Sequence, residues 1–454
     1  MLLFTLSLFT VLTCPTIAFN VKIEGEAQNG YYLTVHLGTP PQKMNLLLDT
    51  GSSNIAVTIS PTASHANYFK FLESSTWRPS KIKIFLRYVE GSWSGYLATD
   101  VLNLCMPSNC SIVTNIGCMT SSENVFDENS PFEGTLGLAY PALARPDSSI
   151  QTFFETFSEI QNIPDVFAVS LCGPFLSSSE HTTSCGKLHI GYISNNDING
   201  TVMYTPIVKE WYYEITLTNM KVGNDDMPFD CRELNQHQTI VDSGTTQLSL
   251  PKKIYYWTIN TLKGHVKKTL HEEFWYNQSE LCFLRDDFDS FSFPNITLSV
   301  YSTYNSSFDL IISPELYILR THNDDETCAI LAIGSSEWGT TIGATILKGF
   351  YVVFNRQMKT LGFANSTFTS SSKRFVSLVT NLVSERKNFN QCKSAENSED
   401  TEISTFTIVL LCCAVVFAVI LLYMLLSWIW RHFILRSNEL SDTSSLVDED
   451  DEEY

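Results

Sequence analysis

A repeated tetrapeptide constrains this chain more than any other feature of its sequence. Asp49-Thr50-Gly51-Ser52 returns 193 residues later as Asp242-Ser243-Gly244-Thr245. The surrounding residues align without a gap, from Leu46 to Val57 in the first copy and from Thr239 to Leu250 in the second. In each copy, apolar residues lead into an aspartate, a glycine turn and small hydroxyl residues, and then resume. This duplication predicts two half-chains of one fold that meet on a pseudo-twofold axis beside both aspartates.

The residue types within the repeat indicate an acid–base pair. Two carboxyl groups held side by side cannot both ionise cheaply, so one titrates low and the other high. Such a pair offers a general base for water and a general acid for a carbonyl oxygen in one cycle. Gly51 and Gly244 let the backbone turn tightly beside each acid, and Ser52 and Thr245 can orient the outer oxygen of their own aspartate. Asp-Thr-Gly or Asp-Ser-Gly alone would be read as an ordinary turn. Their occurrence twice, with the same pattern of apolar residues on both sides, favours a catalytic role.

A second repeat supports the duplication. The segment Glu133–Leu138 follows the first aspartate by about the same interval as Thr341–Ala344 follows the second. Each segment contains an apolar residue followed by glycine. A strand with glycine at this position can pass directly behind an aspartate loop, because glycine has no side chain.

Composition and local patterns predict a mainly β protein. The 454 residues suffice for two lobes with appendages, and the net charge of −19 argues against nucleic acid as a partner. Short apolar or alternating runs separated by Gly, Pro, Asn and Ser turns predict many strands. Helical patterns are few, and they lie at 149–158, at 252–263 and near Leu347. We expect the boundary between an N-terminal lobe (19–205) and a C-terminal lobe (206–394) near Pro206.

Two apolar stretches predict entry into the secretory pathway and a membrane anchor. Residues 1–18 read as a signal peptide. Residues 404–430 are predicted to cross the lipid bilayer as one helix, because no charged residue occurs between Glu402 and Arg431. A polar, acidic stalk (395–403) precedes this helix, and an acidic tail (431–454) follows it. The excess of basic residues just after the helix predicts a type I topology, with the lobes lumenal or extracellular and the tail cytosolic.

Cysteines and glycosylation sequons agree with an oxidising compartment, where disulfides are the default. No Cys/His cluster has a spacing typical of zinc, so we predict neither a metal nor a cofactor. The predicted glycosylation sites are the six Asn-x-Ser/Thr asparagines, Asn109, Asn199, Asn277, Asn295, Asn305 and Asn365.

On these motifs the chain resembles pepsin-like aspartic proteases (peptidase family A1) over roughly residues 28–394. Further segments that carry the resemblance are Gly38–Gln42, Leu250–Lys253, Gly349–Phe354 and Leu361–Ala364. With its predicted membrane helix and short acidic tail, the chain is most similar to the membrane-anchored β-secretase (memapsin) branch. The resemblance implies a bilobal β fold with a cleft between the lobes and Asp49 and Asp242 on its floor. It also implies a monomer that hydrolyses extended polypeptides.

The resemblance implies a flap as well, a hairpin over residues 88–100 that closes over the substrate. Tyr88 matches the flap tyrosine of the family, Trp93 matches its buried partner, and Gly91 lies in the turn between them. The alternative is that Tyr88 is an ordinary surface aromatic of a hairpin.

The disulfide expectations also depend on the resemblance. Cys172 matches a position of the β-secretase branch whose usual partner, near residues 363–367, is missing here. A pairing with Cys185 is a replacement that would close a hairpin. Cys118 is left over, and we expect it to be buried in a strand. The expected pairs are Cys231–Cys392 and Cys282–Cys328, which match the branch, together with Cys172–Cys185 and Cys105–Cys110.

Two departures from the family affect the expected function. About ten residues separate Ala18 from Tyr31, so either the start is truncated or the protein needs no propeptide. Ser249 stands where β-secretases carry an arginine, and Gln247 replaces a nearby asparagine. Loss of a fixed cation weakens any preference for acidic substrate side chains, so we do not predict β-secretase specificity.

Several alternatives for the function stay open. A tethered enzyme would cleave the ectodomains of other membrane proteins, or it would degrade engulfed protein in an acidic compartment. The rival from another class is a catalytically silent binding protein on the same scaffold, marked by a lost aspartate or a crowded glycine, and neither mark is present. The segment 442–447 resembles an acidic dileucine endocytic signal, so the balance between cell surface and endosome stays open.

Overall fold

A computed structural model describes residues 18–61, 67–88, 91–105, 110–126, 130–171, 184–276, 279–284, 291–302, 306–322, 326–367, 378–380, 382–384, 392 and 414–432. The chain divides into two compact units, residues 1–394 and residues 395–454. The predicted signal peptide up to residue 17, the stalk and the tail from residue 433 lie outside the described residues.

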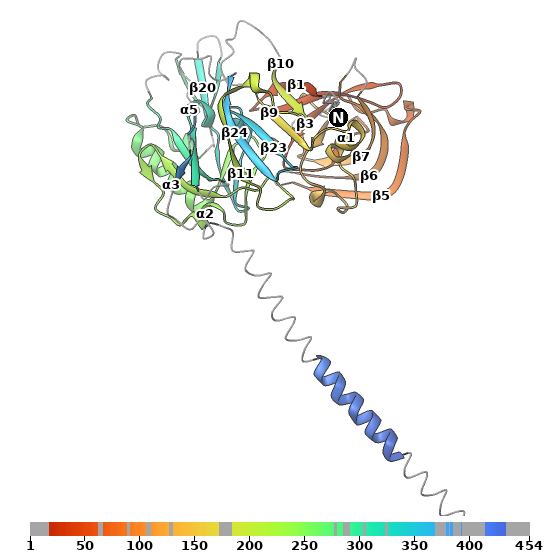
Figure 1. The fold of residues 1–454 in the computed structure, drawn as a ribbon. Helices are drawn as coiled ribbons and strands as arrows, with labels where there is room; N and C mark the ends of the chain where they lie inside the picture. Colours follow the sequence, from red (N-terminus) through yellow and green to blue (C-terminus); the bar gives the residue numbers. More distant parts are fainter. Residues whose placement is uncertain are drawn as a thin grey trace, which may run out of the picture. The chain divides into compact units, whose positions relative to one another are not determined.

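The first unit is mainly β (Figure 1). Strands of its first half are β1 (Phe19–Glu26), β2 (Gly30–Leu37), β3 (Gln42–Asp49), β4 (Ile55–Thr58), β5 (Arg78–Arg87), β6 (Ser92–Asn103), β7 (Ser111–Glu123), β8 (Gly134–Gly137), β9 (Val166–Ser170), β10 (Ser184–Ile190) and β11 (Ile198–Pro206). Strands of its second half are β12 (Leu217–Val222), β13 (Asp225–Asp226), β14 (Thr239–Val241), β15 (Leu248–Pro251), β16 (Leu281–Leu284), β17 (Ile296–Tyr301), β18 (Ser306–Ile312), β19 (Ile318–His322), β20 (Glu326–Leu331), β21 (Ile333–Ser336), β22 (Thr340–Ile342), β23 (Phe350–Asn355), β24 (Thr360–Ser366), β25 (Leu378–Val379) and β26 (Val383–Ser384).

Helices make up a smaller part of this unit, and the longest of them, α3, has 14 residues. They are α1 (Phe153–Gln161), α2 (Cys231–Leu234), α3 (Lys252–His265), α4 (Glu272–Trp275), α5 (Pro314–Tyr317) and α6 (Ala344–Leu347), with 3₁₀ turns η1 (Phe71–Glu73), η2 (Pro141–Leu143) and η3 (Asn195–Asp197). The prediction of a helix from residue 149 was wrong at its start. The Asp147 carboxylate accepts hydrogen bonds from the Ser149 amide and hydroxyl, and this local turn competes with helix formation.

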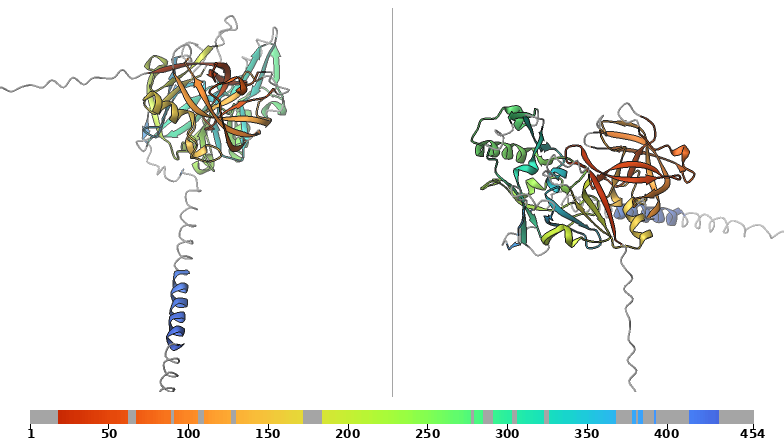
Figure 2. Two further views of the ribbon diagram at one scale, coloured as in Figure 1. Left: turned by 90° about the vertical axis from the view of Figure 1, so that its right-hand side faces the viewer. Right: turned by 90° about the horizontal axis from the view of Figure 1, so that it is seen from above.

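One large sheet joins the two halves of the unit. Among the described strands its order is β11-β24-β23-β9-β10-β1-β2-β3-β8-β4-β7-β6-β5. The halves meet at two antiparallel pairs, β9–β23, in which Phe167 lies opposite Phe354, and β11–β24. Figure 1 shows β9, β23 and β24 side by side at the centre, and Figure 2 (right) separates the red-to-orange first half from the green-to-cyan second half. The expectation of a mainly β protein with two lobes is confirmed.

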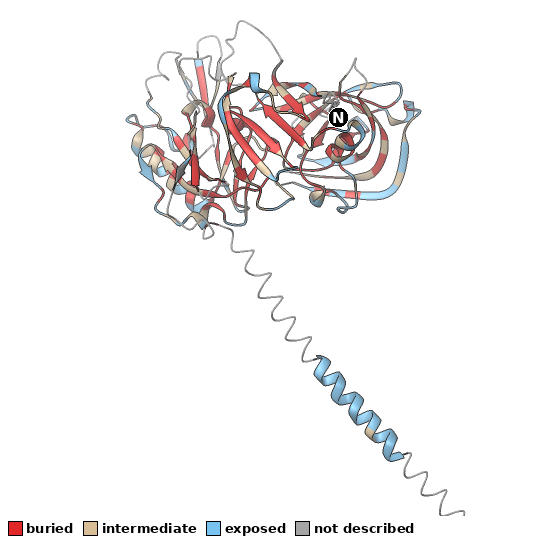
Figure 3. Ribbon diagram, in the orientation of Figure 1, coloured by how far each residue is buried: buried red, intermediate tan, exposed pale blue. Residues whose placement is uncertain are grey.

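Burial follows the sequence pattern (Figure 3). In β2 alternate residues are buried, from Tyr31 to Leu37, as expected of a strand with one face on the core. In β9 every residue is buried, and β23 is buried up to Phe354. Apart from their last residues, Ser170 and Asn355, these two strands carry apolar or aromatic side chains, because both of their faces are covered where the lobes meet.

The second unit contains one described helix, Ala414–His432, which is long and apolar enough to cross a membrane. Its side chains are almost all exposed (Figure 3). The first ten residues of the predicted span 404–430 lie outside the described residues.

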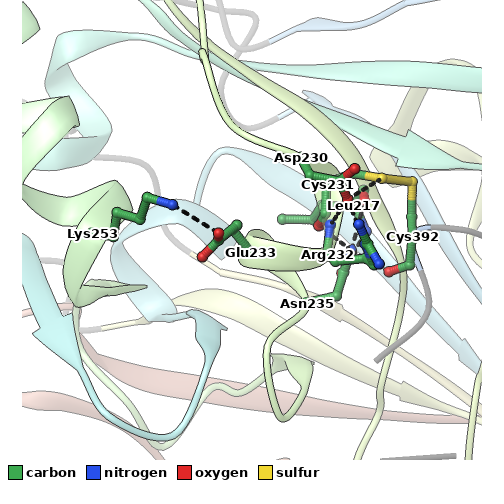
Figure 4. A network of polar contacts seen from close by, with 8 residues as sticks. All are labelled: Leu217, Asp230, Cys231, Arg232, Glu233, Asn235, Lys253 and Cys392. Carbon is green, nitrogen blue, oxygen red and sulfur yellow. Dashed lines mark hydrogen bonds and ion pairs between the residues drawn. A yellow bond between two sulfur atoms is a disulfide. The ribbon is translucent and has the colours of Figure 1, made fainter. Parts of the chain in front are cut away.

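A buried asparagine fixes the C-terminal end of the first unit to the second lobe (Figure 4). The Asn235 side chain exchanges two hydrogen bonds with the Leu217 backbone, at 2.9 and 2.8 Å. Its amide also donates to the carbonyls of Cys231 and Cys392, both at 2.9 Å. The Cys231–Cys392 disulfide closes the same site.

We predict that Asn235→Ala lowers the free energy of unfolding by about 2 to 4 kcal/mol, because it leaves several buried backbone groups unpaired. Urea unfolding of the chain in detergent micelles measures this loss. The matched control is Asn219→Ala, which removes only an exposed hydrogen bond to Asp226 and should change stability by less than about 0.5 kcal/mol. Equal effects of the two substitutions would contradict the assigned role of Asn235.

Candidate active site

The two aspartates lie on loops of identical construction. Strand β3 ends at Asp49 and pairs in parallel with β8, so that Asp49 lies opposite Gly137, and β4 pairs with the other edge of β8. In the second lobe, β14 pairs in parallel with β22, and β15 lies on the other edge of β22. The repeat in the sequence is therefore a repeat in the structure.

Glycine is required where the strands β8 and β22 pass behind the loops. A methyl group on Gly137 would lie 2.6 Å from the Ser53 carbonyl carbon, and one on Gly343 would lie 2.3 Å from the Gln247 carbonyl oxygen. Both distances are well inside van der Waals contact, so a larger residue would push the aspartate loops away from their strands.

Thr50 and Ser243 join the two loops directly. The Thr50 amide donates to Ser243 Oγ at 3.1 Å, and the Ser243 amide donates to Thr50 Oγ1 at 2.9 Å. Each hydroxyl then donates to a carbonyl of the opposite loop, from Thr50 to Val241 at 3.0 Å and from Ser243 to Leu48 at 2.6 Å. This role was not predicted from the sequence. Its signal was the presence of hydroxyl residues at matching positions of the two repeats.

Each carboxyl group is held in the same way within its own loop. The Gly51 amide donates to Asp49 Oδ1, and the Gly244 amide donates to Asp242 Oδ1, both at 2.8 Å. The outer oxygen of Asp49 accepts from the Ser52 hydroxyl. The outer oxygen of Asp242 accepts from Thr245 Oγ1 at 2.6 Å.

The two buried carboxyl groups face one another across the glycines. A methyl group on Gly51 would lie 2.5 Å from Asp242 Cγ, and one on Gly244 would lie 2.5 Å from Asp49 Oδ1. Burial and then the charge of Asp242 raise the pKa of Asp49, and the hydrogen bonds from Ser52 and Gly51 only partly oppose this. Asp49 therefore keeps a proton at pH values where an ordinary aspartate has lost it.

The flap residues lie on the hairpin of β5 and β6. The Tyr88 amide donates to the Gly91 carbonyl at 2.7 Å and closes the turn; residues 89–90 lie outside the described residues. Trp93 is buried, and its indole N–H donates to the Tyr88 phenol oxygen at 3.3 Å. Burial and then the charge of Asp49 raise the pKa of Tyr88 to about 12. The phenol thus stays neutral within electrostatic reach of Asp49.

Tyr212 is a further aromatic residue near the pair that the sequence analysis missed. Burial raises its pKa first, the charges of Asp242 and Asp49 raise it further, and Arg145 lowers it. This side chain therefore lies within electrostatic reach of both carboxyl groups. The aromatic run Trp211-Tyr212-Tyr213 was its only signal in the sequence.

The structure contains three of the expected disulfides, Cys105–Cys110, Cys231–Cys392 and Cys282–Cys328. Cys172 lies outside the described residues, and with it the pairing Cys172–Cys185. Cys118 is a buried free thiol on β7. Among the described residues, the group able to hold a metal ion is Glu280 with Cys282 and Cys328, whose sulfurs are already joined to each other.

The described sequon asparagines differ in exposure. Asn199 and Asn295 are exposed, whereas Asn365 is half-buried. The Asn365 side-chain oxygen accepts a hydrogen bond from the Val379 amide at 2.8 Å. Asn109, Asn277 and Asn305 lie outside the described residues.

Comparison with known proteins finds one matching family model and several relatives. The model of the eukaryotic aspartyl protease family matches residues 30–366. A beta-secretase of Strongylocentrotus purpuratus is 38% identical over 380 residues, which cover 77% of this chain and 70% of that protein. Pepsin-2B of Gadus morhua is 25% identical over 354 residues, 76% of this chain and 98% of the pepsin. Pepsin A of Canis lupus familiaris is 28% identical over 241 residues, 52% of this chain and 59% of the pepsin.

We predict that Gly51→Ala destabilises the protein by about 1 to 3 kcal/mol, because the added methyl group overlaps the Asp242 carboxyl group. The matched control is Gly264→Ala on α3, where an added methyl group meets nothing within 4 Å. This control should be neutral or stabilising by up to about 1 kcal/mol, because alanine favours a helix over glycine. Urea unfolding separates the two variants, and a neutral Gly51→Ala would contradict the facing geometry.

Proposed function

The chain belongs to the eukaryotic aspartyl protease family and is an aspartic endopeptidase, and we propose that Asp49 and Asp242 are its catalytic residues. The resemblance to pepsin-like aspartic proteases that its motifs predict is confirmed. The observation that carries the proposal is the facing of two buried carboxyl groups across Gly51 and Gly244, on loops joined by Thr50 and Ser243.

In the proposed mechanism the pair holds one proton and one water molecule. Asp49 carries the proton, because burial and the neighbouring charge favour its neutral form. The ionised Asp242 takes a proton from the water as the water attacks the peptide carbonyl carbon, and Asp49 donates its proton to the carbonyl oxygen. The tetrahedral intermediate then collapses: the leaving amine takes the proton held by Asp242 as the C–N bond breaks, and a hydroxyl of the intermediate returns a proton to Asp49, so that the pair again holds one proton. The reaction forms no covalent bond to the enzyme.

Ser52, Thr245 and the flap have supporting roles in this proposal. The two hydroxyls hold the outer carboxyl oxygens, so that the inner oxygens stay directed at the water. Tyr88 and Gly91 at the tip of the hairpin, with Trp93 behind them, would cover the scissile peptide and exclude bulk water. Asp49 raises the pKa of the Tyr88 phenol, which supports a position of the tip over the pair.

We also propose a single-pass type I topology. The apolar helix Ala414–His432 supports one crossing of a membrane, with lobes 19–205 and 206–394 on the lumenal or extracellular side. Tethering raises the effective concentration of the enzyme toward other membrane proteins. Cleavage of their ectodomains is therefore the favoured role, and degradation of protein in an acidic compartment is the alternative.

We predict that Asp49→Asn and Asp242→Asn each lower kcat/KM by about 10³-fold or more. The assay is cleavage of a denatured protein mixture by the chain in detergent micelles, from about pH 3.5 to about pH 7.5. Wild-type activity should fall as the pH rises through the raised pKa of Asp49, because the proton donor is then lost. Cleavage that survives either substitution would contradict the paired mechanism.

Ser249 supports a neutral substrate subsite in the second lobe. It lies on β15 between the buried Leu248 and Leu250, so its half-buried side chain points away from the core. Its cross-strand neighbours are Gly334 and Thr341, and the Gln247 side chain lies against Gly334. This face presents hydroxyl and amide groups without a charge.

We predict that Ser249→Arg raises kcat/KM for a peptide carrying glutamate by about tenfold relative to the same peptide carrying glutamine, because it adds a cation to this face. A library of paired peptides, with the substitution placed in turn on each side of the cleaved bond, identifies the position that responds. An unchanged ratio at every position would show that Ser249 lies outside the substrate path.

A further inference from the structure

Tyr213 is a fully buried tyrosine that connects the two lobes. Its backbone belongs to the second lobe, where its carbonyl accepts a hydrogen bond from the Val241 amide at 3.1 Å, one residue before Asp242. Its phenol crosses to the first lobe and donates to the Leu138 carbonyl at 2.5 Å. Burial above all raises the pKa of this phenol well above its usual range, so the group keeps its proton and stays a donor.

Both ends of this connection are bonded to an aspartate loop. The Leu138 amide donates to the Asp49 carbonyl at 2.8 Å, so the residue that accepts the phenol proton is itself bonded to the first aspartate. On the other side, Val241 is the last residue of β14 and leads directly into Asp242. Three hydrogen bonds therefore lead from Asp49 through Leu138 and Tyr213 to the strand that carries Asp242.

The second lobe shows what the phenol supplies at Leu138. Ala344 holds the matching place, because each of the two residues follows the glycine that passes behind its aspartate loop. The Ala344 carbonyl accepts from the Lys348 amide at 3.0 Å, at the end of helix α6. No such helix begins at Leu138, since the next element, η2, starts three residues later. Tyr213 thus provides the donor in the first lobe that a helix provides in the second.

The connection adds a second point at which the lobes are joined beside the aspartates. The bonds between Thr50 and Ser243 join the two loops themselves, and a junction at one point leaves the loops free to rotate relative to each other. Tyr213 joins the lobes at a separate place, and two points fix the rotation as well as the distance. Its ring packs edge-on against Phe167 and Phe354, with centroids 5.9 and 4.6 Å away, so the phenol is held in place.

We propose that Tyr213 is a positioning residue for the catalytic pair: its phenol, donated across the lobes to Leu138, sets the orientation of the Asp49 carboxyl group relative to that of Asp242. The inference deepens the proposed function and rests on it. Its distinctive consequence concerns titration. The charge of Asp242 raises the pKa of Asp49, and this effect weakens when the two groups are no longer held face to face.

The test compares Tyr213→Phe with Tyr317→Phe in the full chain in detergent micelles. The Tyr317 phenol is equally buried and donates to the Pro294 carbonyl, also at 2.5 Å, but both of these groups lie in the second lobe. Each substitution removes one buried hydrogen bond and keeps the ring, so both should lower the urea midpoint by a similar amount.

Only Tyr213→Phe should change the kinetics for a peptide that the wild type cleaves. We expect kcat to fall by about tenfold with KM nearly unchanged, because the pair is misplaced in the transition state. The fall of kcat/KM with rising pH should also move to lower pH, by about half a pH unit or more, because Asp49 then loses its proton earlier.

Equal kinetic changes in the two variants, or a Tyr213→Phe protein with the kcat and pH profile of the wild type, would overturn the proposal. If the wild type cleaves no peptide, the proposed function fails, and infrared titration of the Asp49 carboxyl group then tests the positioning by itself. A lower pKa of Asp49 in Tyr213→Phe than in Tyr317→Phe would still support it, and equal pKa values would overturn it.

Discussion

The reciprocal hydrogen bonds between Thr50 and Ser243 are the interaction on which the rest of this structure depends. They are buried and they join loops that lie 193 residues apart in the chain. With both hydroxyls also bonded to carbonyls of the opposite loop, neither aspartate can move without the other. The facing of the carboxyl groups, the raised pKa of Asp49 and the need for glycine at positions 51 and 244 all follow from this fixed separation.

The two lobes repeat the same arrangement of strands around an aspartate loop, but the faces beside the two loops differ. In the first lobe the face beside the aspartate is apolar and covered by the β5–β6 hairpin, with Trp93 buried against it. In the second lobe the matching face carries half-buried, neutral polar residues at Gln247, Ser249 and Thr341. In the proposed function the first lobe therefore covers the pair, while the second lobe contacts substrate side chains.

The sequence predicted the parts of the site that depend on local patterns. The same order of apolar residues, aspartate and glycine around Asp49 and Asp242, and the glycines of the strands behind them, could be read from the sequence because both copies of the duplication retain them. The contacts of Thr50 with Ser243 were not visible, because they depend on how two distant loops meet. The start of α1 was misplaced because an aspartate turn at Asp147 competes with the helix.

Infrared spectroscopy of the carboxyl pair detects a shared proton directly. At about pH 5.5, above the ordinary pKa of aspartate, we expect one protonated carboxyl group in the wild type that is missing from Asp49→Asn. The difference spectrum should therefore contain a carboxylic acid C=O band from Asp49. A difference spectrum without this band would contradict the account, because the two carboxyl groups would then share no proton.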